Sequence, residues 1–146
     1  MDGVDKMLVS SKGRYALRVM LELADNSSGE FISLKKISEN QNISLKYLEI
    51  IVSLLNKAKL VDSHRGKNGG YRLNKLPENY QVGEILRITE DGLIPVDCNC
   101  LNGSKKSCEM AANCRTKKLW GELDKLVNGY LDKVSLKDLQ NGKVTF

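Results

Sequence analysis

Residues 33–57 read SLKKISENQNISLKYLEIIVSLLNK and predict two helices joined by a tight connection. Ser33 and Ser44 each stand where a helix would begin, and a serine oxygen accepts hydrogen bonds from the free N–H groups of a first turn. Apolar residues then recur at helical spacing, over 34–40 and more strongly over 45–57. Two capped helices with such a short link, the second being longer, are typical of the helix-turn-helix motif.

Further elements are expected on either side of this motif. Residues 11–25 place apolar side chains largely at helical spacing and predict a preceding helix. After the motif, two short strand-like runs, 60–65 and 71–73, flank the pair Asn68-Gly69 and a further glycine. Asparagine and glycine readily adopt the positive φ that primed hairpin turns require. The sequence therefore predicts a β-hairpin wing beside the helix-turn-helix.

A long amphipathic helix is expected over residues 115–134, with shorter helices over 81–89 and 136–140. The apolar stripe of the long helix consists of Leu119, Leu123, Leu126, Tyr130 and Val134. Little core remains for this stripe to cover, so it predicts a helix-to-helix contact in a homodimer.

The expected fold is mainly α: a winged helix-turn-helix domain with a small β-hairpin wing and a long C-terminal dimerisation helix. We expect the winged helix-turn-helix domain over 7–90, a cysteine-rich loop over 91–114, and the dimerisation helix with a C-terminal arm over 115–146.

Composition indicates a soluble, cytoplasmic protein of 146 residues, 41% of them apolar. The chain lacks a run long enough to span a membrane and the apolar stretch of a secretory signal. Residues 1–75 hold 13 Lys and Arg against 8 Asp and Glu, residues 76–100 hold 1 against 5, and residues 101–146 hold 9 against 5. Two basic regions that flank an acidic one suit a polyanion as partner.

The predicted DNA contacts lie on the second helix of the motif and on the wing. The first residues of a recognition helix face base edges in the major groove, and a wing lies along a neighbouring groove or the backbone. On the helix the candidates are Ser44, Lys46, Tyr47 and Glu49, and on the wing they are Arg65, Lys67 and Asn68. Lysine and arginine can contact phosphate or guanine, and Glu49 can accept from a cytosine amino group.

All four cysteines fall within 17 residues, in the pattern Cys98-x-Cys100-x7-Cys108-x5-Cys114. Cytoplasmic thiols normally stay reduced, which favours metal or redox chemistry over disulfides. The pattern lacks the paired CxxC of a zinc ribbon, whereas iron–sulfur clusters are held by thiolates at variable spacings. We therefore prefer an iron–sulfur site to zinc or to four unrelated buried cysteines. His64, in the wing, is expected to pack or to contact phosphate rather than to bind metal.

Several motifs together resemble those of the winged-helix iron–sulfur transcriptional regulators typified by IscR and NsrR. They are SKGRYA at 11–16, ISLKYLE at 43–49, GGY at 69–71, VGEI at 82–85 and LW at 119–120. The resemblance covers nearly the whole chain. It implies a homodimeric bacterial transcription factor that holds a cluster through three cysteines and binds double-stranded operator DNA.

The resemblance also assigns roles to single residues. Cys100, Cys108 and Cys114 match the three cluster cysteines. Glu49 matches the recognition-helix glutamate that discriminates operator types in IscR-like members, and Arg65 matches their wing arginine.

This chain departs from the family pattern at the fourth ligand. IscR-like members have a histidine where this chain has Lys117, and NsrR-like members use an aspartate where it has Arg14. Cys98 is the local substitute, and Asp97 and Glu109 are oxygen alternatives.

The leading interpretation is a dimeric regulator, a repressor or an activator, whose operator affinity is controlled by the cluster. A [2Fe–2S] cluster is preferred, with [4Fe–4S] as the alternative. The competing interpretation is a zinc-stabilised or cluster-free DNA-binding repressor that senses thiol or cysteine status. An enzyme is not expected, because the chain has no catalytic Cys-His pair, CxxC pair or Gly-rich phosphate loop.

Overall fold

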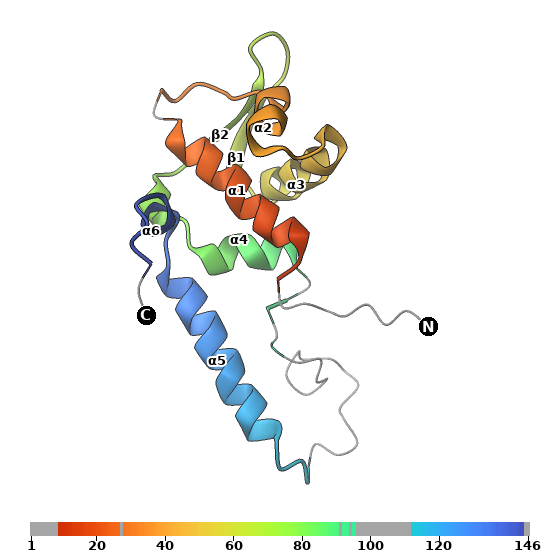
Figure 1. Cartoon of the computed structure of the whole chain (residues 1–146), viewed down its shortest axis with the longest axis vertical. Helices are drawn as coiled ribbons and strands as arrows, with labels where there is room; N and C mark the ends of the chain where they lie inside the picture. The colour runs from red at the N-terminus through yellow and green to blue at the C-terminus, as the bar shows by residue number, and fades with distance from the viewer. Residues whose placement is uncertain (1–8, 27, 91, 94, 96–111, 145–146) are drawn as a thin grey trace.

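The computed structural model describes residues 9–26, 28–90, 92–93, 95 and 112–144. Most elements form a helical body, and one long helix extends away from it (Figure 1). In chain order the elements are α1 (Ser11–Asp25), α2 (Leu34–Gln41), α3 (Leu45–Lys57), β1 (Val61–His64), β2 (Gly70–Leu73), the 3-10 turn η1 (Pro77–Asn79), α4 (Val82–Thr89), α5 (Lys117–Lys133) and α6 (Leu136–Gln140). The mainly helical class with one hairpin is confirmed.

The helix-turn-helix forms where the serines predict it. Ser33 Oγ accepts from Lys36 N at 3.2 Å to cap α2, and Ser44 Oγ accepts from Tyr47 N at 3.2 Å to cap α3. Between the helices, Asn42 adopts a left-handed conformation with a φ of 54°, which asparagine tolerates better than most residues. The local sequence thus determines both starts and the turn.

The main apolar core of the body receives side chains from α1, α2, α3, α4 and α6, and a smaller cluster joins α4 to the end of α5. The largest fully buried members of the main core are Tyr80, Met20, Ile37, Leu48, Ile51, Leu55, Ile85, Leu136, Val19 and Val52. Leu45 belongs to the apolar pattern that predicts the helix over 45–57, yet it is 46% exposed. It is the first residue of α3 and lies before the helix reaches the core.

The wing is an antiparallel pair in which Val61 faces Leu73 and His64 faces Gly70. The prediction of an Asn-Gly primed turn is corrected here, because a five-residue loop, 65–69, joins the strands. Within it Gly66 and Asn68 have positive φ, and Gly69 N donates to Gly66 O at 2.9 Å. β2 also pairs with Ile32, and a Cβ on Gly70 would collide with the Ile32 carbonyl. This second pairing fixes where β2 begins.

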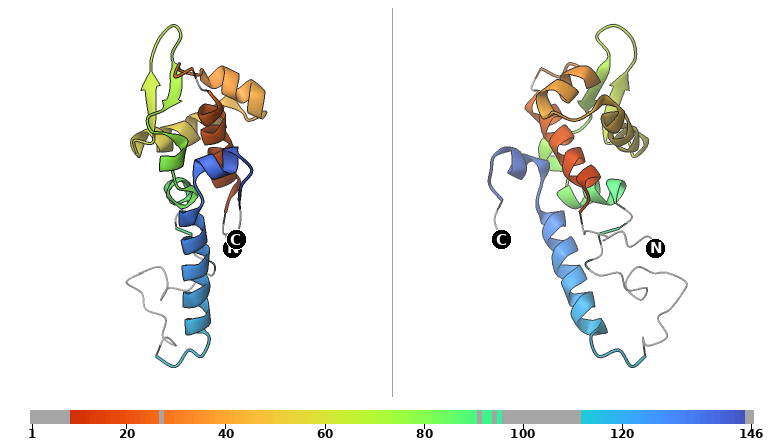
Figure 2. Two further views of the ribbon diagram at one scale, coloured as in Figure 1. Left: turned by 90° about the vertical axis from the view of Figure 1, so that its left-hand side faces the viewer. Right: turned by 45° about the vertical axis from the view of Figure 1, so that its right-hand side comes forward.

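α5 is joined to the body only near its C-terminal end, within the described residues (Figure 2). Arg87 of α4 forms an ion pair with Asp132 at 2.8 Å and donates to Asn128 at 2.9 Å. Val82 N donates to Val134 O at 2.9 Å, and Gln140 of α6 donates to Asp25 of α1 at 2.9 Å. The chain after α5 therefore folds back onto the body.

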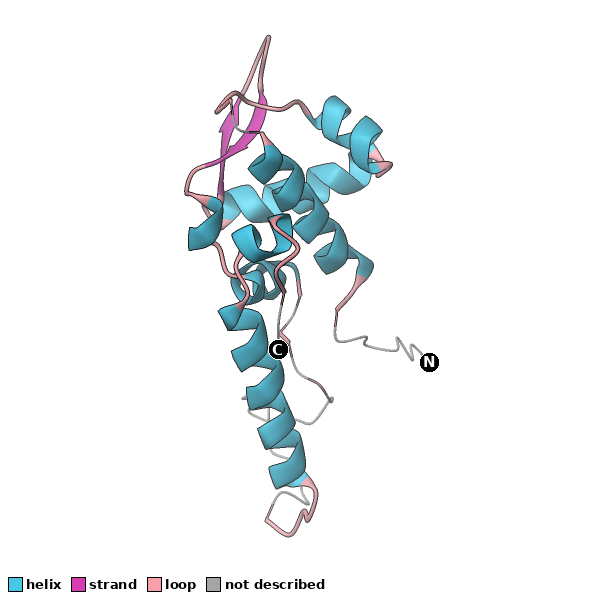
Figure 3. Ribbon diagram, turned by 60° about the vertical axis from the view of Figure 1, so that its left-hand side comes forward, coloured by secondary structure: helices cyan, strands magenta, loops and turns pink. Residues whose placement is uncertain are grey.

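The two ends of the molecule differ in content (Figure 3). The strands, α2 and α3 lie at one end, and the N-terminal end of α5 lies at the other. No helix among the described residues is long and apolar enough to cross a membrane.

Candidate nucleic-acid interface

The N-terminal part of α3 presents charged side chains to solvent. Ser44, Lys46 and Glu49 are all exposed. Lys46 and Glu49 are three residues apart, a spacing that places two side chains on one helix face. The Ser44 hydroxyl accepts the Tyr47 N–H, so it also fixes the first turn on which these residues stand. This turn can therefore offer a cation and a carboxylate together to a polar partner.

Tyr47 differs from these neighbours because its ring packs against α1. It meets the Tyr15 ring edge-to-face, with centroids 5.7 Å apart and an interplanar angle of 84°. Burial raises the pKa of Tyr47, and the charges of Tyr15 and Glu90 act in the same direction while Arg14 acts against them. The predicted contact residue thus also anchors α3 to α1.

A polar network fixes α2 relative to α1. Arg18 Nε donates to Gln41 Oε1 at 3.2 Å, and its guanidinium also donates to the Gln41 carbonyl. Glu22 accepts from Asn40 at 2.6 Å and from Gln41 at 2.5 Å. The Arg18 guanidinium lies 5.3 Å from the centre of the Tyr15 ring, so the same side chain contacts the ring that packs on α3. Sequence patterns do not reveal these contacts, because they join residues about 20 positions apart.

The wing loop carries the three remaining predicted contacts. Arg65, Lys67 and Asn68 are all exposed, and they lie in the 65–69 loop rather than in the paired strands. Their side chains are therefore available at the tip of the hairpin, at the same end of the molecule as α2 and α3 (Figure 1).

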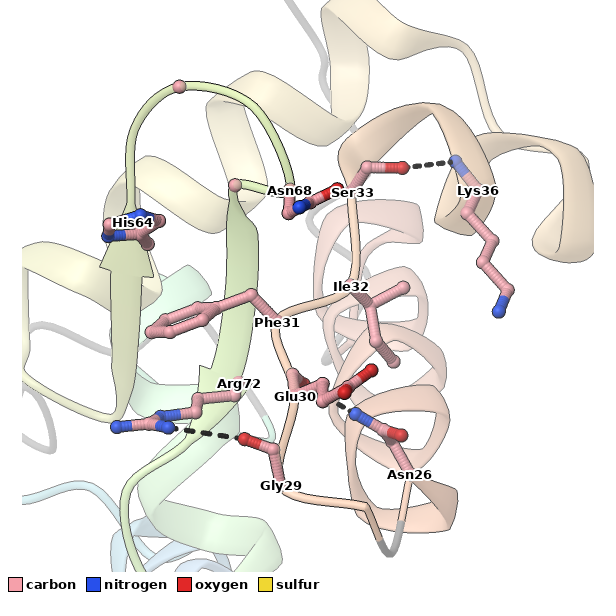
Figure 4. Close-up of a pocket in the computed structure, with 12 residues that line it drawn as sticks. Asn26, Gly29, Glu30, Phe31, Ile32, Ser33, Lys36, His64, Asn68 and Arg72 are labelled. Carbon is pink, nitrogen blue, oxygen red and sulfur yellow. Dashed lines mark hydrogen bonds between the residues drawn. The ribbon is translucent and has the colours of Figure 1, made fainter.

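The base of the wing is fixed by aromatic and cationic side chains (Figure 4). The Arg72 guanidinium lies 4.5 Å from the centre of the Phe31 ring, donates to Gly29 O at 3.1 Å and pairs with Asp62 at 3.6 Å. His64 lies against Phe31 with ring centroids 5.3 Å apart. His64, which is expected to pack or to contact phosphate, packs on Phe31 and stays exposed to solvent, and a groove separates this base from the start of α2.

Tyr80 connects the wing to the core, a role that the sequence did not predict. It is fully buried, and its hydroxyl donates to Leu60 O at 2.8 Å and accepts from Asn74 N and Lys75 N at 3.0 and 3.1 Å. Burial raises the pKa of its phenol. The hydroxyl therefore holds both ends of the hairpin, where the chain enters β1 and where it leaves β2.

Of the predicted cysteine site, the structure describes Cys114. Its partly exposed thiol lies just before α5, with Sγ 3.4 Å from Thr116 Oγ1. Hydrogen bonds from the Thr116 side chain and backbone, and then from the Lys117 backbone, lower the pKa of this thiol. Cys98, Cys100 and Cys108 lie outside the described residues, as do the alternatives Asp97 and Glu109.

The chain is similar to known regulators over most of its length. The profile of the Rrf2 family, described as iron-dependent transcriptional regulators, matches residues 9–142. The HTH-type transcriptional regulator IscR of Escherichia coli O1:K1 is 38% identical over 137 residues, which are 94% of this chain and 82% of that protein. IscR of Aliivibrio salmonicida is 38% identical over 133 residues, which are 91% of this chain and 77% of that protein.

Solved structures agree with these sequence matches. The structure of CymR, the global cysteine regulator of Bacillus subtilis, is similar with a TM-score of 0.73 and 36% identity, covering 92% of this chain and 96% of that one. The structure of T. potens IscR has a TM-score of 0.72 and 34% identity, covering 96% and 90%. These matches confirm the predicted winged-helix fold, and the relatives' names agree with a regulator rather than an enzyme.

Proposed function

The chain belongs to the Rrf2 family of DNA-binding transcriptional regulators, and we propose that it acts as a homodimer whose α3 and wing read a palindromic operator. One observation carries the proposal: the exposed Lys46 and Glu49 of a firmly capped α3 lie at the same end of the molecule as the exposed wing loop. In this proposal residues 7–90 bind DNA, 91–114 hold a cofactor and 115–146 join two copies.

Each contact residue has a role that follows from its chemistry. Glu49 accepts from a cytosine amino group, and Lys46 contacts guanine or phosphate. Arg65 reaches a base edge or a phosphate, Lys67 contacts phosphate, and Ser44 and Asn68 add neutral hydrogen bonds. Tyr47 contributes through its position against Tyr15 as well as at the interface.

The long helix supports the dimer. Within the described part of the chain, α5 buries none of its residues, and Leu119 and Leu126 are 58% and 69% exposed. A helix with an uncovered apolar stripe is favoured to pair with a second copy. A two-fold dimer would present two recognition helices to two half-sites.

The proposed cofactor is an iron–sulfur cluster, [2Fe–2S] rather than [4Fe–4S]. Cys114 fits such a group, because its lowered pKa favours the thiolate that binds iron. Cys100 and Cys108 complete the set of three, with Cys98 as the fourth ligand. When bound, the cluster supplies a centre that responds to iron supply or oxidants.

A second candidate function is a cluster-free regulator that senses thiol or cysteine status. Two observations favour it: the Cys114 thiol is partly exposed with a lowered pKa, and one of the similar structures is a global cysteine regulator. An accessible thiol whose pKa is lowered is the kind that oxidants modify.

Spectra of protein purified without oxygen separate the two candidates. Cluster binding gives visible absorbance with bound iron and sulfide, and a Mössbauer spectrum reports the number of irons. We expect Cys100→Ala, Cys108→Ala and Cys114→Ala each to abolish the cluster, and Cys98→Ala to leave it assembled but more labile or spectrally shifted. A colourless protein free of iron, whose DNA binding changes on oxidation of Cys114, would overturn the cluster in favour of the thiol sensor. An unchanged Cys98→Ala spectrum and cluster lifetime would exclude Cys98 as a ligand.

A further inference from the structure

Glu90 joins two elements that are distant in the sequence. It follows the last residue of α4, and its N–H donates to Leu86 O at 2.9 Å. Its Oε1 accepts from Ser10 N at 2.9 Å and from Ser10 Oγ at 2.6 Å. Ser10 is also the residue that caps α1, through a hydrogen bond from Gly13 N at 3.4 Å. A single carboxylate oxygen therefore holds the start of α1.

The surface that receives this carboxylate is shaped by Gly13. Gly13 is buried, and a Cβ at this position would collide with Glu90 Oε1 and come within 3.2 Å of Leu86. Its φ is not in the left-handed region, so space rather than backbone conformation requires the glycine. The absence of a side chain at Gly13 therefore lets the Glu90 carboxylate lie against the first turn of α1.

The same turn leads directly to the recognition helix. Tyr15 follows Gly13 by two residues, and its ring packs edge-to-face on Tyr47 in the first turn of α3. α4 packs against both α1 and α3, and α1 also packs against α3. The three helices are therefore in mutual contact, and Glu90 joins the end of α4 to the start of α1.

We propose that Glu90 is a positioning residue for DNA recognition: it holds the first turn of α1, and α1 sets the orientation of α3 through the Tyr15–Tyr47 contact. This proposal rests on the proposed DNA-binding function. Glu90 itself stays off the DNA, and its effect comes from fixing the turn that carries Lys46 and Glu49. Removing it should therefore reduce specific recognition more than general attraction to DNA.

The test compares variants on a duplex selected from random DNA by the wild-type protein. Glu90→Ala should weaken binding to this duplex about tenfold, the equivalent of losing one charge-assisted hydrogen bond. Glu90→Gln keeps an oxygen that accepts from Ser10 and should lose only about threefold. Glu84→Gln, a carboxylate of the same helix that faces Lys75 at 4.0 Å, is the matched control and should bind like wild type.

Two readouts separate positioning from general damage. Binding to an unrelated duplex at low salt should stay equal in Glu90→Ala, Glu90→Gln and the Glu84→Gln control, because each loses one negative charge and phosphate contacts supply nonspecific affinity. Amide hydrogen exchange around Tyr15 and Tyr47 should accelerate in Glu90→Ala and return towards wild type in Glu90→Gln. If Glu90→Ala does not fold, Ser10→Ala removes one of the two hydrogen bonds to Glu90 together with the cap that Gly13 N donates to, and should show a loss of the same kind.

Each contrary result has a distinct meaning. If Glu90→Ala binds the selected duplex as tightly as wild type does, the positioning role is overturned and the proposed function is not. Where Ser10→Ala is used in its place, the same result has the same meaning. Parallel losses on selected and unrelated duplexes would also overturn it, in favour of a contact with DNA or a general loss of structure. If wild-type protein enriched no sequence, the proposed function would fail, and this inference with it.

Discussion

α3 and the long helix α5 carry similar apolar stripes, yet the structure buries that of α3 and leaves Leu119 and Leu126 of the other exposed, while Val134 at its end packs within the same chain. In α3, Leu48, Ile51 and Leu55 are all fully buried in the core. In α5, Leu119 and Leu126 remain more than half exposed to solvent within the described structure. An amphipathic pattern therefore predicts a helix without saying whether its apolar face packs against the same chain or another one. The exposed leucines of α5 support the proposal that two copies of the chain pair through this helix.

The largest difference between the two helices is expected in the free energy of unfolding when a leucine of each is replaced by alanine. Leu48→Ala should lower the free energy of unfolding by about 2–5 kcal/mol, because it leaves a cavity in a closed core. Leu126→Ala should change the unfolding free energy of the dissociated chain by less than about 0.5 kcal/mol, because its side chain is already exposed. Urea unfolding at low protein concentration measures both. Equal losses would show that α5 packs onto its own chain.

A charge placed in the α5 stripe tests the contact between copies. Leu126→Glu should convert dimers to monomers in sedimentation and weaken binding to the selected duplex about a hundredfold, since one helix-turn-helix reads too few base pairs alone. Lys125→Gln is the control, because it changes the net charge by the same amount beside the stripe. If Leu126→Glu stays dimeric and binds DNA as wild type does, the dimer contact lies elsewhere.

Substitutions in the wing, at the other end of the molecule from the start of α5, should have a smaller effect on DNA affinity. Arg65→Ala should cost about 1–3 kcal/mol of binding to the selected duplex if the guanidinium reaches a base edge. Lys67→Ala should weaken binding to all duplexes about equally and reduce the salt dependence, as expected of a phosphate contact. Titrations at several salt concentrations distinguish these patterns. Wild-type affinity in both variants would remove the wing from the interface.

The sequence predicts features that depend on neighbouring residues better than features that depend on residues far away in the chain. Ser33, Ser44 and the short turn at Asn42 act on neighbouring residues, so the helix-turn-helix was predictable from its own sequence. The five-residue wing loop was not, because β2 also pairs with Ile32, which lies 39 positions before its partner Tyr71. Glu90 holds Ser10 across 80 positions, and no local pattern marks that contact.

In the predicted DNA-contact site, too, the sequence indicates some features and tertiary packing determines others. Exposure of Lys46, Glu49, Arg65 and Lys67 follows from their places on a helix face and a loop. The position of Tyr47 against α1 depends on tertiary packing, and so does the burial of Tyr80 beneath the wing. Residue types therefore indicated which side chains are available to DNA, whereas the structure shows what holds them in place.

Selection of binding sites from random DNA, with wild-type protein and Glu49→Ala compared in the same experiment, shows whether paired α3 helices read the operator. Wild-type protein should enrich a palindrome. Glu49→Ala should enrich the same palindrome with relaxed base identity at one symmetric pair of positions, because only the cytosine contact of α3 is lost. A site without two-fold symmetry, or identical base preferences in the two proteins, would contradict the claim that paired α3 helices read the operator.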